Sequence, residues 1–322
     1  MLFNVFLDLL AVLAAAVIIF IIALAASLLW TPYPIKDKTA DFTMDEPAGF
    51  YPHNWIVRQF GKWVAIVCFG IPNWVFGRLV VEGLENLSGL GNGVRVVLAS
   101  NHTSRADTVM IQLFLWFKGF RSFVENLIYV IGSKYFNRDK FLSRMLLSAG
   151  RINIVPPDMI EGRSPEEQRV IARILKECLK ALKAQINQHG LMLFPEGARA
   201  LDGQMKRIQS GAAGLIRCAD TVVPIGIRAA QKGVWSTSKP PRWPLFGRDV
   251  KVVIGPPRPV NWLDQESRRL AREYGITPSQ AFVDLVGKAI AELVPEHGGI
   301  YNQHLEQIWK QDRERRNEPQ EG

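Results

Sequence analysis

Cysteine is scarce in this sequence. The three cysteines, Cys68, Cys178 and Cys218, lie far apart in the chain and form no C-x-x-C pair. This spacing argues against both a disulfide framework and a zinc cluster, and it suits a reducing compartment. The five histidines are scattered as well, and the sequence contains neither a P-loop nor a G-x-S-x-G nucleophile elbow. We therefore expect no resident metal or cofactor.

Positive charge is missing from the start of the chain. No lysine or arginine precedes Lys36, and residues 9–30 carry no charge of either sign. At about 1.5 Å per residue, a helix of this length reaches roughly 33 Å and can cross the hydrocarbon core of a bilayer. The alternative is a secretory signal peptide cleaved near residues 23–25, but Asp8 stands where that peptide needs a basic residue, and the run is too long. We expect residues 1–32 to form a retained transmembrane anchor.

The distribution of positive charge also predicts an orientation. Basic residues begin with Lys36 and Lys38, on the C-terminal side of the apolar run. The positive-inside rule then places the rest of the chain on the cytoplasmic face of the cell membrane. The net charge of +9 calls for an anionic partner, for which nucleic acid, a membrane surface and a phosphorylated substrate are the candidates.

A second apolar stretch, residues 63–81, is less continuous, because Pro72, Asn73 and Arg78 interrupt it. We interpret residues 33–78 as a linker and a broken interfacial helical segment that lies at headgroup depth. Two alternatives remain. A second span would return the rest of the chain to the other side of the membrane, and a buried core helix followed by a strand would not touch lipid at all.

From residue 79 the pattern changes to alternating strands and helices. Short apolar runs typical of strands occur at 79–82, 94–99, 127–131, 152–155, 190–194, 222–227 and 250–254. Helical patterns lie between several of them, at 106–118, 138–148, 165–187 and 210–219. This alternation predicts an α/β fold with a mostly parallel sheet flanked by helices. We assign residues 79–295 to this domain and residues 296–322 to a charged C-terminal tail, a solvated helix that frays.

The first polar motif, SNHTSRADTVM, follows the strand at 94–99 and precedes a helix, so it lies where open α/β sheets bind ligands. Five positions along a continuous helix rotate a side chain by about 140°, so we expect His102 in the turn before the helix, with Asp107 in the first turn reaching back. Histidine can transfer a proton near neutral pH. Alternatively, Ser104 and Asp107 form a capping-box-like helix start, which leaves Asn101 and His102 unexplained.

The second motif, LMLFPEGARA at residues 191–200, again follows a strand and enters a turn. Gly197 permits close approach of a ligand, Arg199 offers a bidentate donor for phosphate, and Glu196 can accept a hydrogen bond from a hydroxyl. A Pro-Glu-Gly turn without any such function is also common. In a third strand, Pro224 is typical of an edge strand, because central strands seldom contain proline.

Together these motifs resemble those of the glycerolipid acyltransferase family, best known from the 1-acylglycerol-3-phosphate acyltransferases. The family's N-H-x-S-x-x-D is matched by Asn101, His102, Ser104 and Asp107, its F-P-E-G-x-R by Phe194, Pro195, Glu196, Gly197 and Arg199, and its V-P-I strand by Val223, Pro224 and Ile225. The resemblance covers roughly residues 79 to 256.

Two positions depart from the family's pattern. Pro156 replaces the arginine of G-x-I-x-I-x-R, and Gln209 replaces the lysine of F-K-x-G. Both lost residues are cations expected near the phosphate of the acceptor. Arg151, Lys206 and Arg207 are candidate replacements, or are simply surface charges.

The resemblance implies an acyl transfer from an acyl thioester, of coenzyme A or acyl carrier protein, to the free hydroxyl of 1-acylglycerol-3-phosphate, forming phosphatidate. His102 would serve as general base, and Asp107 would hold its ring and stabilise the imidazolium. Contacts with the substrates would fall to Asn101, Ser104, Arg151, Glu196, Gly197, Arg199 and Pro224.

Three alternatives remain open. The acceptor could be a different lysolipid, such as lysophosphatidylglycerol or an amino-acid lysolipid. A His–Asp hydrolase of lysolipids would use water in place of the alcohol. A basic membrane or nucleic-acid scaffold would explain the charge, but it gives His102 and the FPEGAR turn no role. We expect membrane lipids, and not nucleic acid, to be the partners.

Overall fold

The computed structural model of this 322-residue chain describes residues 79–88, 90, 94–103, 107–125, 127–132, 151–154, 190–197, 200, 202–228 and 250–317, together with isolated positions between 164 and 186. The predicted anchor (1–32) and the predicted linker and interfacial segment (33–78) lie outside these residues. Within the described part of the chain, no helix has the length and apolar character needed to span a bilayer.

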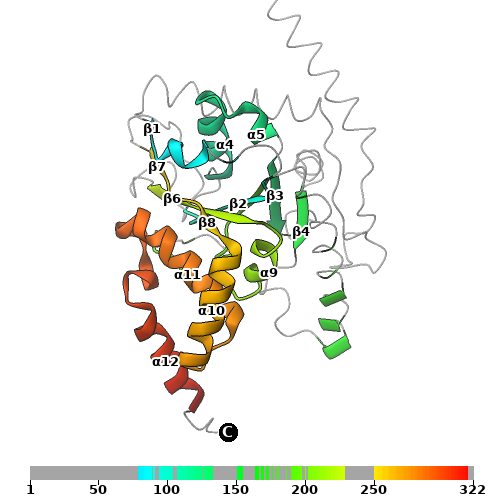
Figure 1. Ribbon diagram of the computed structural model, residues 1–322, viewed down its shortest axis with the longest axis vertical. Helices are drawn as coiled ribbons and strands as arrows, with labels where there is room; N and C mark the ends of the chain where they lie inside the picture. The colour runs from blue at the N-terminus through cyan, green and yellow to red at the C-terminus, as the bar shows by residue number, and fades with distance from the viewer. Residues whose placement is uncertain are drawn as a thin grey trace, which may run out of the picture.

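An eight-stranded sheet runs through the domain (Figure 1). Its strands are β1 (Leu79–Glu82), β2 (Val96–Ser100), β3 (Leu127–Gly132), β4 (Arg151–Ile154), β5 (Gly190–Leu193), β6 (Thr221–Arg228), β7 (Val250–Ile254) and β8 (Arg258–Pro259). The strand order is β1-β7-β6-β2-β5-β3-β4, with β8 paired to β6. Most pairings are parallel, whereas β7 and β8 run antiparallel to β6. The predicted α/β fold is confirmed, and each predicted apolar run overlaps an observed strand.

Helices cover both faces of the sheet (Figure 1). On one face lie α4 (Asp107–Phe117) and α5 (Arg121–Glu125); on the other lie α9 (Ala212–Ile216), α10 (Val260–Tyr274), α11 (Pro278–Leu293) and α12 (Leu305–Asn317). The described residues also form short 3-10 helices, η2 (Leu84–Leu87), η4 (Pro295–His297) and η5 (Gly299–Asn302).

The predicted helices are partly confirmed. The pattern at 106–118 corresponds to α4, and the pattern at 210–219 shortens to α9. The described residues between 165 and 180 are helical, whereas 138–148 lies outside the described residues.

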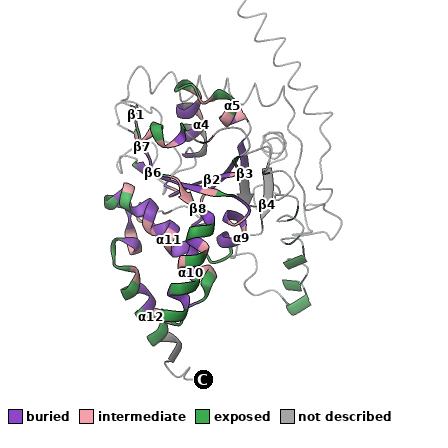
Figure 2. Ribbon diagram, viewed as in Figure 1, coloured by how far each residue is buried: buried purple, intermediate pink, exposed green. Residues whose placement is uncertain are grey.

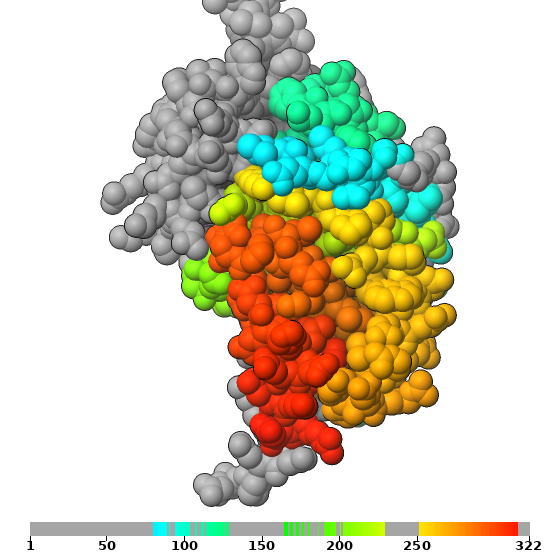
Figure 3. Space-filling model, turned by 60° about the vertical axis from the view of Figure 1, so that its left-hand side comes forward, coloured from blue at the N-terminus to red at the C-terminus, as the bar shows by residue number. Residues whose placement is uncertain are grey.

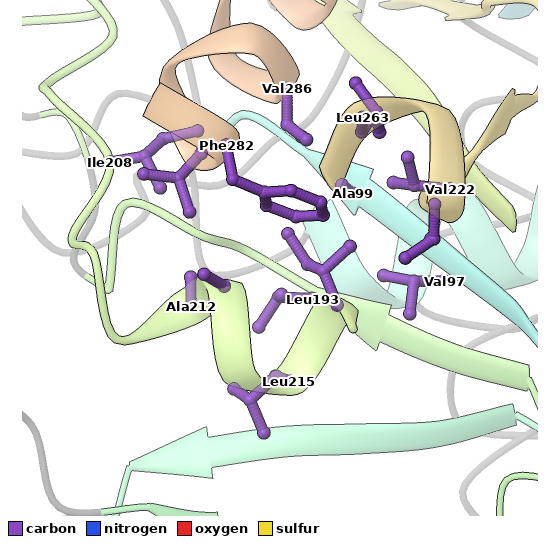
Figure 4. Packing of buried hydrophobic residues seen from close by; sticks show 14 of the residues in the cluster. Val97, Ala99, Leu193, Ile208, Ala212, Leu215, Val222, Leu263, Phe282 and Val286 are labelled. Carbon is purple, nitrogen blue, oxygen red and sulfur yellow. The ribbon is translucent and has the colours of Figure 1, made fainter. Parts of the chain in front are cut away.

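The alternation of side chains along β2 divides the core into two clusters. Val97 and Ala99 pack with Phe282 of α11, as Figure 4 shows, whereas Leu98 packs with Phe114 of α4. All three β2 residues are 0% exposed, as expected for a strand covered on both faces. The carboxyl end of β2, from which the first polar motif continues, is therefore held by the core of the domain.

The C-terminal helix α12 is not the solvated tail that the sequence suggested. Ile308 and Trp309 are 1% exposed, and the Trp309 ring lies 5.2 Å from the ring of Tyr274 in α10. Leu305 packs against the same cluster. These positions recur at helical spacing, and the other faces of α12 carry the exposed residues Glu306, Lys310 and Arg313 (Figure 2). In the space-filling view, residues 250–317 form a continuous part of the visible molecular surface (Figure 3).

Pro224 lies in an internal strand, so the edge-strand interpretation is wrong. β6 is flanked by β2 on one side and by β7 and β8 on the other. The Pro224 carbonyl accepts a hydrogen bond from Gly255 N–H at 2.8 Å, at the point where the β7 ladder ends. Since the N–H and C=O of a strand residue point to the same side, the missing N–H falls in the gap between the ladders of β7 and β8, where no partner is lost.

Candidate active site

His102 and Asp107 meet as expected from their spacing. Nδ1 of His102 lies 3.0 Å from Oδ2 of Asp107. The histidine lies in the turn after β2, and the aspartate is the first residue of α4. The Asp107 carboxylate is 4% exposed, and the imidazole is 19% exposed. A buried carboxylate thus contacts one edge of a partly exposed imidazole, an arrangement that can orient a ring for proton transfer.

The Asp107 carboxylate also organises the turn before the helix. Its Oδ2 accepts the main-chain N–H of Thr103 at 2.6 Å, and its Oδ1 accepts the Thr103 hydroxyl at 3.2 Å. This contact resembles the reach-back of a capping box, but it is made to Thr103 and not to Ser104, which lies outside the described residues. Asp107 therefore both stabilises the start of α4 and pairs with the histidine, because its two oxygens accept hydrogen bonds from Thr103 and contact His102.

The imidazole has a defined tautomer and a defined orientation. A carboxylate can only accept a hydrogen bond, so the tautomer that this contact favours has Nδ1 of His102 as donor and the lone pair on Nε2. Among the described residues, no partner lies within hydrogen-bonding distance of Nε2. The ring of Phe194 stacks on the imidazole, with centroids 4.2 Å apart and an interplanar angle of 24°. The ring is thus fixed by a carboxylate at one edge and an aromatic face.

Glu196 joins the second motif to the first through main-chain groups. Its Oε1 accepts the N–H of His102 at 2.9 Å, and its Oε2 accepts the N–H of Lys206 at 2.8 Å. The carbonyl of His102 accepts the N–H of Ala200 at 2.9 Å. Glu196 is 4% exposed. With each oxygen accepting a main-chain N–H, Glu196 holds the backbone of His102 in this structure.

Burial raises the pKa of the Glu196 carboxyl from 4.5 to about 7. The two main-chain N–H groups and the charge of Lys206 oppose this increase, whereas the charge of Asp107 adds to it. Two N–H donors aimed at two oxygens suit the carboxylate better than the carboxylic acid, whose own hydrogen would compete with one donor. Protonation of Glu196 near neutral pH therefore weakens its hold on the turn of His102.

Asn101 and Pro224, both predicted to contact substrate, lie in the interior. The amide of Asn101 donates to the Ile227 carbonyl at 3.0 Å and accepts the Ile227 N–H at 2.7 Å. Asn101 is 1% exposed, so it extends the pairing of β2 with β6 beyond the end of the strand. Pro224 packs against Gly255, where a Cβ would lie 2.9 Å from the proline ring. Among the described residues, both make internal contacts.

The remaining predicted residues are placed less completely. Gly197 is exposed with φ 71°, and an added Cβ would meet nothing within 4 Å, so glycine is needed for the turn's backbone and not for space. Arg151 begins β4, and its side chain is not described. Ser104 and Arg199 lie outside the described residues, as does Pro156.

Of the cations considered as replacements in the acceptor site, Arg207 is already engaged. Its guanidinium binds Asp284 at 2.8 Å and also pairs with Asp312. Arg207 is therefore a structural cation, which corrects the suggestion that it substitutes for a phosphate ligand. The side chain of Lys206 is exposed and remains a candidate.

Sequence reasoning missed Asp284, which is 0% exposed in α11. The available signal was a single carboxylate within the apolar stretch AFVDLVGKAI, since a charge at a core position requires partners. One partner, Gln280, lies in α11 itself, and the others come from three separate segments, which no local pattern could reveal. Among the described residues, no three His, Cys, Asp or Glu side chains are grouped as a metal site would require.

Among known protein families, residues 78–228 match the family model described as Acyltransferase. Among solved structures, a crystal structure of the 1-acyl-sn-glycerophosphate (LPA) acyltransferase PlsC from Thermotoga maritima is similar, with 19% sequence identity over 71% of this chain and 78% of that chain and a TM-score of 0.42. No curated protein sequence matches the chain.

Proposed function

We propose that this protein transfers an acyl group from an acyl thioester to the free hydroxyl of 1-acylglycerol-3-phosphate, forming phosphatidate, since residues 78–228 match the family model described as Acyltransferase. The observation that carries the proposal is the contact of 3.0 Å between His102 Nδ1 and the buried Asp107. The contact leaves Nε2 as a proton acceptor on a partly exposed ring.

The proposed chemistry needs one base and no enzyme nucleophile. Nε2 of His102 takes the proton of the acceptor hydroxyl as that oxygen attacks the thioester carbonyl carbon. Asp107 stabilises the imidazolium that forms, because its carboxylate lies against Nδ1–H. The C–S bond then breaks as the ester C–O bond remains, and the imidazolium returns its proton to the departing thiolate. Free thiol and acylated lipid are the products, so the atoms balance.

The acceptor and the donor are assigned from the sequence motifs. The turn at Gly197 and the cation Arg199 beside it suit the phosphate of the acceptor, since a guanidinium binds phosphate oxygens in pairs. Either coenzyme A or acyl carrier protein would carry the acyl group, and no further cofactor is needed. We place the enzyme on the cytoplasmic face of the cell membrane, anchored by residues 1–32, because basic residues begin with Lys36 on the C-terminal side of the apolar run.

The test compares membranes that contain the full chain, its His102→Ala variant or its Asp107→Asn variant. Each receives acyl-coenzyme A or acyl carrier protein and a panel of lysolipids, and the products are separated by mass spectrometry. We expect His102→Ala to lower turnover by roughly two to four orders of magnitude with normal thermal unfolding. Asp107→Asn should also lower turnover strongly, because an amide stabilises the imidazolium less well.

His304→Ala is the matched control, because His304 is exposed and precedes α12, outside the site. A folded His102→Ala protein with near-normal transfer would refute the base. Release of free fatty acid without phosphatidate would point to a hydrolase, and transfer only to another lysolipid of the panel would reassign the acceptor.

A further inference from the structure

The segment of residues 203–208 lies between the candidate site and the C-terminal helices. On the side of the site, Lys206 N–H donates to Oε2 of Glu196 at 2.8 Å. Oε1 of the same carboxylate accepts the His102 N–H at 2.9 Å. A single buried side chain therefore joins the 203–208 segment to the main chain of the candidate base.

The other side of the 203–208 segment is bonded to residues that follow α11. Met205 N–H donates to the His297 carbonyl at 2.8 Å, and Nδ1 of His297 lies 2.9 Å from the Gly203 carbonyl. Gly299 makes this approach possible: its φ is 55°, and a Cβ there would overlap the Met205 carbonyl oxygen. The main chain of the segment is thus hydrogen-bonded on both sides, to the Glu196 carboxylate and to residues near His297.

The carboxylate of Asp284 gathers the groups that hold this segment. Its Oδ1 accepts the Tyr301 hydroxyl at 3.0 Å and Gln280 Nε2 at 2.9 Å. Its Oδ2 accepts Trp309 Nε1 and Arg207 Nη2, each at 2.8 Å. We refer to these five residues as the Asp284 cluster. A buried carboxylate is costly unless its oxygens are fully bonded, so this cluster favours one arrangement of its members.

Two members of the Asp284 cluster also bond the main chain of the 203–208 segment. The Tyr301 hydroxyl accepts the Ile208 N–H at 2.9 Å, and Gln280 Nε2 donates to the Ile208 carbonyl at 3.1 Å. Burial, and then the charge of Asp284, raise the pKa of the Tyr301 hydroxyl, so it stays protonated and can donate to Asp284. The Tyr301 ring fits against Gly287, where a Cβ would overlap it.

We propose that Tyr301 and Asp284 are positioning residues for His102, an inference that rests on the proposed acyl transfer. They fix the 203–208 segment, whose Lys206 N–H meets Glu196, and Glu196 in turn holds the main chain of His102. Four of the five members of the Asp284 cluster lie beyond residues 78–228, which are the residues that match the family model. The C-terminal helices would therefore complete the catalytic site without contacting substrate.

The proposed effect follows from how few hydrogen bonds connect Tyr301 with the main chain of His102. Without the Tyr301 hydroxyl, the buried Ile208 N–H has no acceptor and the end of the segment must shift to find one. A shift that separates Lys206 N–H from Glu196 leaves this buried carboxylate with one main-chain donor in place of two. The turn of His102 then loses its fixed partner, and small misplacements of a catalytic group are costly in rate.

The test uses the full-length chain in membranes and compares Tyr301→Phe with Tyr274→Phe. Tyr274 belongs to the same helical layer and contacts Trp309, so this control makes the same chemical change without touching the 203–208 segment. We expect Tyr301→Phe to lower kcat roughly ten- to hundredfold and to leave KM for the acyl donor within roughly twofold. Tyr274→Phe should leave both values near those of the wild type.

The acid side of the pH–rate profile gives a second readout. The hydrogen bond from Lys206 N–H lowers the pKa of Glu196. If Tyr301→Phe breaks this hydrogen bond, the acid limb of the profile should move to higher pH. The charges that act on Glu196, those of Asp107 and Lys206, are the same in both variants. A purely structural role would lower the fraction of folded protein but leave the profile where it is. Equal kcat per folded molecule and equal profiles in the two variants would overturn the proposal.

Hydrogen exchange separates this proposal from the proposed function. In the purified full chain, the amides of Lys206 and His102 should exchange faster in Tyr301→Phe than in Tyr274→Phe, whatever the enzyme's substrate. If the wild type transfers no acyl group but this difference is present, the acyl transfer fails and the positioning stands; equal exchange overturns the positioning. If Tyr301→Phe does not fold, Gln280→Met, which removes the bond to the Ile208 carbonyl, is judged by the same two criteria.

Discussion

Replacing Glu196 with glutamine tests whether this buried carboxylate holds the turn of His102. The side chain keeps its shape but becomes neutral at every pH, and its amide nitrogen cannot accept the N–H of either His102 or Lys206. One main-chain N–H then lacks an acceptor in the interior, which costs about 1–3 kcal/mol. We expect Glu196→Gln to turn over more slowly, and its stability relative to the wild type to depend on pH.

The difference in stability should depend on pH with a defined sign. The pKa of Glu196 is raised in the folded protein from 4.5 to about 7, which at about 1.4 kcal/mol per pH unit corresponds to on the order of 3 kcal/mol. A raised pKa means that the folded state binds the proton more tightly than the unfolded state. The contribution is therefore fully present below pH 4.5 and is lost as the pH rises through about 7.

Urea unfolding of both proteins in the same detergent, from pH 4 to pH 8, measures this contribution. The stability of the wild type relative to Glu196→Gln should be highest at acid pH and should fall by on the order of 3 kcal/mol towards pH 8. Asp107 and Lys206, whose charges act on Glu196, are common to both proteins and cancel in the comparison. A difference that does not change with pH would show that Glu196 titrates normally, and the argument from its burial would fail.

Two further predictions concern residues outside the described part of the chain. Arg199→Lys should raise KM for the lysolipid acceptor much more than KM for the acyl donor, because an ammonium cannot reproduce the paired hydrogen bonds of a guanidinium; unchanged use of the acceptor would remove Arg199 from the site. A reporter fused after Gly322 should be active only in the cytoplasm, and the protein should stay in membranes after carbonate washing. Activity of the reporter on the opposite face would instead mean that residues 63–81 span the membrane.

The main features of the fold were predictable because they depend on local pattern. The strands of the sheet are continuous apolar runs, and such runs are what a strand covered on both faces requires. The contact between His102 and Asp107 was predictable for the same reason, since five residues separate them and helix geometry limits where each can lie. The exposed turn at Gly197 also follows from its residue type.

The partners of the buried polar groups were not predictable from the sequence. Asn101 and Glu196 carry the right chemistry for binding substrate, and only the fold shows that main-chain groups of Ile227, His102 and Lys206 occupy their polar atoms. The charged tail was misread for a similar reason, because the average polarity of α12 hides the apolar side on which Ile308 and Trp309 pack.

The sequence by itself therefore determined the α/β fold, the strand ends at which chemistry can occur, and the His102–Asp107 pair, because each depends on residues close together in the chain. Only the tertiary structure decided how the base is held. Glu196 reaches His102 across 94 positions, and Arg207 reaches Asp284 across 77. Buried polar atoms must find partners wherever the packed chain supplies them, and that supply is a property of the whole fold and of no single segment.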